Sequence, residues 1–155
     1  MNAIQVQGPL GLPPRVIEKL TKGQARKIPR IITFPFEVND GETIQLDTRT
    51  PSSGCFQVEA INTGGNDVFL YNIKDTYFNQ AWFDSEVYNF LMGGDGRSMG
   101  LLPCPVILPP STQIIVNIRY DATDPNTGGS DKVVGQILLI GYILDGITAE
   151  DLNLR

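Results

Sequence analysis

The sequence contains no histidine and only two cysteines. Without histidine, a Ser-His-Asp or Cys-His catalytic arrangement is impossible, and the side chain that most often transfers protons near neutral pH is missing. Cys55 and Cys104 are too few for a disulfide framework or a zinc site. We therefore expect two buried, reduced thiols.

The sequence also lacks a long apolar run. Its longest apolar stretch, residues 133–144, is interrupted by glycine and glutamine and is too short to cross a membrane as a helix. Residues 1–14 do not combine a basic segment with an apolar run, so no secretory signal peptide is predicted. These features predict a soluble protein, made in a cytoplasm, with no membrane partner.

The remaining candidates for catalysis are paired carboxylates and a glycine-rich loop. Asp84 and Glu86 are two residues apart and would share one face of a strand, as a glycosidase pair does, but a solvated turn is the preferred interpretation. Residues 93–100 lack the G-K-S/T sequence of a phosphate loop, so we interpret them as a flexible loop with Arg97 as a contact residue. We predict neither an enzyme nor a cofactor.

Oxygen ligands for Ca²⁺ are present in the polar loop at residues 121–131. They are Asp121, Asp124, Asn126 and Asp131. Because their spacing is not that of an EF-hand, a surface turn is the preferred interpretation and no metal site is predicted.

Charge is divided unevenly along the chain. Residues 1–30 contain six basic and one acidic side chain, a net charge of +5, whereas the remainder contains six basic and sixteen acidic side chains, a net charge of −10. A basic segment of this kind is expected to lie on an acidic surface, and a neighbouring copy of the chain offers one. Direct nucleic-acid binding is disfavoured because the acidic remainder would repel phosphate.

Apolar spacing predicts one short helix followed by strands. Val16, Ile17 and Leu20 would share one face of a helix over residues 14–20, with Pro14 at its first position and Gly23 at its end. Strands are predicted at residues 31–37, 43–47, 55–61, 68–73, 112–120 and 133–144, with less regular ones at 76–83 and 86–92. About eight strands without helical crossovers predict an all-β protein, a jelly-roll-like β-sandwich.

Two strands carry special features. Pro35 predicts that the strand at residues 31–37 lies at a sheet edge or is bulged. Residues 133–144 are apolar on both faces, which predicts a central strand that is covered on both sides or belongs to an interface. One face carries Val134, Leu138, Ile140 and Tyr142, and the other carries Val133, Ile137, Leu139 and Ile143.

Three regions are therefore predicted. Residues 1–30 form an extended basic N-terminal arm with a short helix, residues 31–145 form the sandwich, and residues 146–155 form a C-terminal tail. Within the tail, Thr148 and Asp151 could begin one helical turn as a capping box does.

Aromatic residues gather between residues 77 and 90. They are Tyr77, Phe78, Trp82, Phe83, Tyr88 and Phe90. They could line a carbohydrate-binding face, but packing in the core or at a subunit interface is the preferred interpretation.

Residues 54–144 resemble the jelly-roll head decoration proteins, also called cement or auxiliary capsid proteins, of tailed bacteriophages. The resemblance rests on the alternating strand at residues 56–60 and on NTGGNDVFLYNI (62–73), AWFDSEVYNFL (81–91), GLLPCPVILPPSTQIIVNI (100–118) and QILLIGYIL (136–144). It implies a homotrimer on the virion surface that clamps adjacent subunits of the major capsid protein. A tail or collar component and a carbohydrate-binding β-sandwich module are the alternatives.

Residues 1–30 are expected to lie across a neighbouring subunit. The basic residues Arg15, Lys19, Arg26, Lys27 and Arg30 would position this arm, and Ile4, Leu10, Leu12, Val16 and Ile17 would anchor it. The apolar anchors would supply much of the affinity and the charges mainly the register. The alternative is an arm that packs on its own domain or stays disordered.

Overall fold

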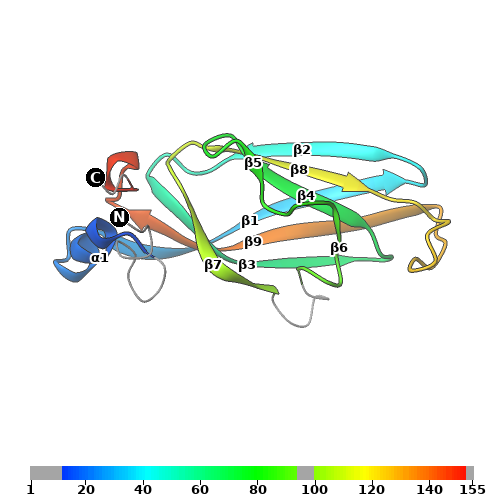
Figure 1. The fold of residues 1–155 in the computed structure, drawn as a ribbon, viewed down its shortest axis with the longest axis horizontal. Coiled ribbons are helices and arrows are strands. Elements are labelled where there is room, and N and C mark those ends of the chain that lie inside the picture. Colours follow the sequence, from blue (N-terminus) through cyan, green and yellow to red (C-terminus); the bar gives the residue numbers. More distant parts are fainter. Residues whose placement is uncertain (1–11, 94–99, 153–155) are drawn as a thin grey trace.

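The computed structural model describes residues 12–93 and 100–152, apart from the side chain of Cys104, and arranges them as a two-layer β-sandwich (Figure 1). The elements are α1 (Pro14–Thr21), β1 (Arg26–Asn39), β2 (Thr43–Arg49), β3 (Gly54–Gly65), β4 (Leu70–Asp75), β5 (Gln80–Ala81), β6 (Val87–Tyr88), β7 (Gly100–Leu108), β8 (Gln113–Arg119), β9 (Lys132–Asp145) and the 3-10 helix η2 (Ala149–Leu152). Among these residues, no helix is long and apolar enough to cross a membrane.

The strands form two antiparallel sheets. Sheet A has the order β1-β9-β3-β7, and sheet B has the order β2-β8-β4-β5, with β6 also pairing with β4. With β5 and β6 taken as one edge position, each successive strand lies in the other sheet, except that β4 and this edge position are both in sheet B. This is the jelly-roll arrangement of two interlocked Greek keys. The all-β sandwich predicted from the sequence is confirmed.

The main core fills the space between the sheets with the inward-facing residues of each strand. On β8, Ile114, Val116 and Ile118 are completely buried and alternate with partly exposed residues, as the period of two predicts. Phe69 meets Phe36 edge to face across the sheets, with ring centroids 4.8 Å apart. The sheets are thus joined mainly by apolar packing.

A second core lies at one end of sheet A, where α1 and the residues after β9 cover its outer side (Figure 1). It consists of Leu12, Val16, Cys55, Leu144 and Ile147. The thiol of Cys55 is free, and burial raises its pKa to about 12, so it stays protonated and unreactive at neutral pH. Ile147 is 1% exposed and Leu152 packs against this core, so the described residues of the C-terminal tail pack on the domain.

Both predicted helix ends are confirmed. Pro14 begins α1, and Gly23 follows it in the left-handed region with a φ of 73°. At the other end of the chain, Asp151 accepts hydrogen bonds from the backbone N–H (2.9 Å) and the hydroxyl (3.2 Å) of Thr148, as the capping-box pattern predicts. This interaction begins η2.

Three strand predictions need correction. β1 begins at Arg26 and not at residue 31, because residues 26–30 pair with β9 at the sheet edge, where Pro29 and Pro35 are tolerated. The predicted strands at 76–83 and 86–92 shrink to two residues each, because turns occupy the rest. β7 was not predicted from periodicity, since its two prolines obscure the alternation.

Candidate interaction surfaces

The acidic side chains of the loop between β8 and β9 are used in its own turns. Asp121 accepts hydrogen bonds from the hydroxyl (2.6 Å) and the backbone N–H (2.9 Å) of Thr123, and Asp124 accepts one from the backbone N–H of Asn126 (2.9 Å). These hydrogen bonds lower the pKa of both carboxyl groups. Across residues 12–93 and 100–152, no three metal-ligating side chains gather at one point.

Asp67 holds this loop to the rest of the sandwich. Its carboxylate accepts hydrogen bonds from the Tyr120 hydroxyl (2.5 Å) and from the backbone N–H groups of Val68 (2.8 Å), Gly128 (2.6 Å) and Ser130 (3.2 Å). Burial alone would raise the pKa of Asp67, but these four donors outweigh it and hold the pKa well below its usual range. Asp67 thereby joins the β3–β4 connection to the β8–β9 connection, and both cross between the sheets at the end opposite α1 (Figure 1).

The other catalytic candidates do not form a site among the described residues. Asp84 and Glu86 are both exposed, and Glu86 is paired with Arg119 on β8 at 3.2 Å. Arg97 lies outside the described residues. The carboxylate pair is thus explained by a solvated turn with one surface ion pair.

The basic stretch of residues 15–27 lies on the chain's own body. The contacts with the body are Arg15 and Lys19 with Asp151 (3.6 and 2.7 Å), Arg26 with Asp145 (3.1 Å), and Lys27 over the ring of Tyr142 (5.2 Å). Lys22 instead pairs with Glu18, one helical turn away in the same stretch (2.6 Å). Asp151 is 2% exposed, and although burial would raise its pKa, the hydrogen bonds from Lys19 and Thr148 lower it overall. An acidic surface was predicted for this stretch, and the last elements of the same chain supply it.

The predicted anchors of the arm separate into three groups. Leu12 and Val16 are buried in the second core of their own chain and Ile17 packs against it, which matches the alternative of an arm that packs on its own domain. The cause is the amphipathic helix α1, whose apolar side covers the end of sheet A. Arg30 is exposed on β1, whereas Ile4 and Leu10 lie outside the described residues.

The aromatic residues divide between the core and the surface. Trp82 and Phe83 pack against the main core. Tyr77 and Phe78 form an exposed edge-to-face pair with centroids 4.8 Å apart, and Tyr88 stacks on Phe90 at 5.3 Å. The packing role preferred from the sequence holds for Trp82 and Phe83. Tyr77, Phe78 and Phe90 are exposed and are available for contacts at the surface.

The outer face of sheet A is mostly uncharged over its middle, where Glu59 at the bulge of β3 accepts a hydrogen bond from the Gln57 side chain (2.7 Å). Residues opposite one another on neighbouring strands point to the same side, so the strand pairings fix which side chains share this face. Across the sheet, the three rows are Pro29, Tyr142, Gln57 and Ile107; Ile31, Ile140, Ala60 and Leu101; and Thr33, Leu138 and Asn62. We call this set, with Val134 farther along β9, the outer face of sheet A.

Much of this face is open to solvent in a single chain. The exposed fractions are 53% for Ile31, 71% for Leu101 and 49% for Val134, values that are high for large aliphatic side chains. The second core covers only the first row, where Tyr142 and Ile107 contact it. The strand order confirms that β9 is central, and both of its sides are apolar. Beyond the first row, the residues that the structure describes do not cover its outer side.

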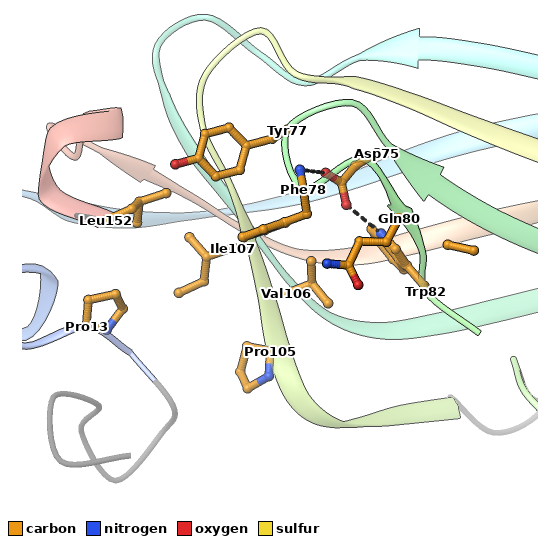
Figure 2. A pocket seen from close by; sticks show the side chains of 11 residues that line it. Pro13, Asp75, Tyr77, Phe78, Gln80, Trp82, Pro105, Val106, Ile107 and Leu152 are labelled. Carbon is orange, nitrogen blue, oxygen red and sulfur yellow. Dashed lines mark hydrogen bonds between the residues drawn. The ribbon is translucent and has the colours of Figure 1, made fainter. Parts of the chain in front are cut away.

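A second apolar surface lies along one edge of the sandwich, between the turn after β4 and strand β7 (Figure 2). This edge groove has a volume of about 460 Å³. It is lined by Pro13, Asp75, Tyr77, Phe78, Gln80, Ala81, Trp82, Pro105, Val106, Ile107 and Leu152. Pro13 and Leu152 lie at one end of it, so the groove begins where the first and last described elements meet.

Asp75 shapes the wall of the groove without offering a free charge to it. One carboxylate oxygen accepts the backbone N–H of Phe78 (2.8 Å), and the other accepts the indole N–H of Trp82 (2.9 Å), as Figure 2 shows. Asp75 is 1% exposed and is the only charged residue that lines the groove. The groove therefore presents apolar and aromatic surface with uncharged polar groups. Neither the groove nor the complete outer face could be located from sequence, because both depend on strand pairing.

Comparisons with known proteins add little to this geometry. No protein-family model matches the sequence, and no curated protein matches it. Among solved structures, an insecticidal delta-endotoxin of Bacillus thuringiensis is similar over 70% of this chain and 19% of the toxin chain, with a TM-score of 0.37 and 11% sequence identity. A likeness this distant carries no conclusion about the function of the chain.

Proposed function

We propose that this chain is a structural protein of a virus particle, which decorates or cements the capsid by self-association and by binding adjacent major capsid protein subunits. The observation that carries the proposal is the group of exposed aliphatic side chains, Ile31, Leu101 and Val134, on the outer face of sheet A. Exposed aliphatic residues grouped on one sheet mark a protein contact more often than a solvated surface. The proposal includes no catalytic step.

The second copy of the chain is the partner that charge favours for this face. The whole chain carries a net charge of −5, so two copies repel each other where acidic groups meet. Apart from Glu59 at the bulge beside them, the three rows at the middle of sheet A are uncharged, so contact there brings few like charges together. Trimeric association is the stoichiometry that the resemblance to head decoration proteins implies.

Binding to a capsid is supported by that resemblance together with the jelly-roll order of the two sheets. The decoration protein would then be exposed on the virion surface. A tail or collar location of the same structural kind would use the same surfaces.

The first test is sedimentation of the purified chain over a range of micromolar concentrations. We expect a species of three times 17.0 kDa, and a chain that stays at 17.0 kDa throughout would contradict self-association in solution.

The second test is the location of the tagged chain in the cells that encode it, after particles are banded on a density gradient. We expect it to band with the particles in a fixed ratio to their major capsid protein. If all of the tagged chain stays at the top of the gradient, the structural role on a particle is wrong.

A further inference from the structure

We propose that the edge groove is a receptor for the chain's own N-terminal segment, residues 1–11, which docks its apolar side chains between the turn after β4 and strand β7. This inference does not rest on the proposed function, because the groove shares only Ile107 with the outer face of sheet A, in the row that the second core contacts. Its failure would leave self-association untouched.

The chemistry of the groove selects an uncharged, apolar occupant. Both carboxylate oxygens of Asp75 are already engaged by donors of its own turn, so a basic ligand would find no free anion there. Phe78 is 50% exposed and Tyr77 is 46% exposed, and these rings offer much of the accessible surface. A pocket of this volume and lining is typical of sites that bind apolar groups.

Residues 1–11 match this requirement more closely than any other part of the basic N-terminal region. They contain no charged side chain, whereas residues 12–30 contain seven. Their apolar side chains are Met1, Ile4, Val6 and Leu10, with Ala3 and Pro9. Leu152 also lines the groove, but the three residues after it contain only one apolar side chain, Leu154, and end in a basic residue. They therefore match the groove less well.

The point of attachment places this segment at the groove. Pro13 lines the groove, and the segment of residues 1–11 ends two positions before Pro13 in the sequence. Eleven residues in an extended conformation span up to about 36 Å, which exceeds what a groove on this scale needs. Tethering also gives a docked segment a high effective concentration, so modest apolar contacts suffice.

Side-chain insertion, and not strand addition, is the expected mode of binding. β7 is the edge strand of sheet A, but Pro103 and Pro105 have no backbone N–H groups with which to form a ladder. The apolar side chains of the segment would instead pack against Val106, Phe78 and Trp82.

Trp82 is the only tryptophan in the chain and lines the groove, so its fluorescence reports occupancy directly. We expect a chain that starts at Leu12 to show a red-shifted emission and a quenching constant for acrylamide at least twofold higher than the full chain. Adding a synthetic peptide of residues 1–11 in excess should reverse both changes. Circular dichroism of the two chains checks that the sandwich is intact.

A point variant covers the case in which the shortened chain does not fold. Ile4→Asp in the full chain should reproduce the increase in quenching, whereas Asn2→Asp adds the same charge without removing an apolar side chain and should keep the full chain's value. Unchanged Trp82 quenching in both Ile4→Asp and the shortened chain would overturn the proposal. A quenching constant that falls as the concentration of the full chain rises would also overturn it, since the occupant would then be a second copy.

Discussion

The two sheets share one core but present opposite exteriors. On sheet A, the three middle rows are uncharged apart from Glu59 at the bulge beside them, and α1 with the residues after β9 covers their end. On sheet B, the corresponding rows mix charged, polar and a few apolar residues: Thr43, Arg119 and Leu70; Gln45, Asn117 and Asn72; and Asp47, Ile115 and Lys74. Since both sheets belong to the same jelly roll, the difference does not come from the fold. The polar exterior of sheet B is typical of a surface that faces water, and the proposed self-association uses the more apolar exterior of sheet A.

The largest expected effect is a difference in unfolding free energy between substitutions on the inner and the outer side of β9. Leu139 is fully buried in the main core, and its neighbour Ile140 lies on the outer face of sheet A. We expect Leu139→Ala to lower the free energy of unfolding by about 2–5 kcal/mol. Ile140→Ala, the matched change one residue away, should cost less than about 1 kcal/mol in the monomer. Chemical denaturation of both variants measures this, and equal losses would mean that Ile140 is part of a core.

A smaller effect compares the exteriors of the two sheets directly. Ile31→Asp places a carboxylate in the middle of the uncharged rows, and we expect it to weaken self-association by about 30-fold or more, equivalent to about 2 kcal/mol. Gln45→Asp adds the same charge to the exposed face of sheet B and should leave association unchanged. Sedimentation velocity measures both, and a comparable loss in Gln45→Asp would move the interface to sheet B.

The smallest effect concerns Asp67, whose hydrogen bonds join the β3–β4 connection to the β8–β9 connection. Because the pKa of Asp67 is lowered in the folded chain, its contribution to stability is present above the ordinary aspartate pKa, near 4, and is lost as the pH falls below it. We expect Asp67→Asn to lower the free energy of unfolding at pH 7 by about 1.5 kcal/mol, because the charged acceptor is lost. The difference from the unmodified chain should shrink on acidification.

The control for this change lies on sheet B. Asp47 is exposed and accepts a single hydrogen bond from Gln113 (2.9 Å), so Asp47→Asn should have little effect on stability at any pH. Thermal unfolding between pH 3 and pH 7 distinguishes the two. If the difference in unfolding temperature between Asp67→Asn and the unmodified chain stays the same at low pH, the Asp67 carboxylate does not stabilise the fold through its charge.

The sequence predicted those features that depend on local pattern. The alternation on β8 and the two apolar sides of β9 were readable, because a strand's side chains alternate between its faces whatever it pairs with. The ends of α1 were readable because proline and glycine act on their own backbone. The edge position of β1 followed from Pro35 for the same reason.

The features that depend on tertiary pairing could not be predicted. Residues 26–30 have a basic composition that suggested an arm, but they extend β1 because Asp145 and its neighbours on β9 lie beside them. Val16 was placed at an intersubunit contact because the sequence does not show that Cys55 and Leu144 need a cover. The edge groove combines residues from β4, β7 and both ends of the described chain, and no local pattern links them.

The central position of β9 in sheet A has a consequence for how the chain is made. β9 is the last strand to leave the ribosome, yet it separates β1 from β3, which are synthesised more than 65 residues earlier. Until it arrives, both strands expose backbone groups on the sides that it will cover, and pairings this distant in sequence form slowly. Nascent chains therefore pass through a period in which β1 and β3 can pair with the wrong partner, and a molecular chaperone that shields them during synthesis would raise the yield of folded protein.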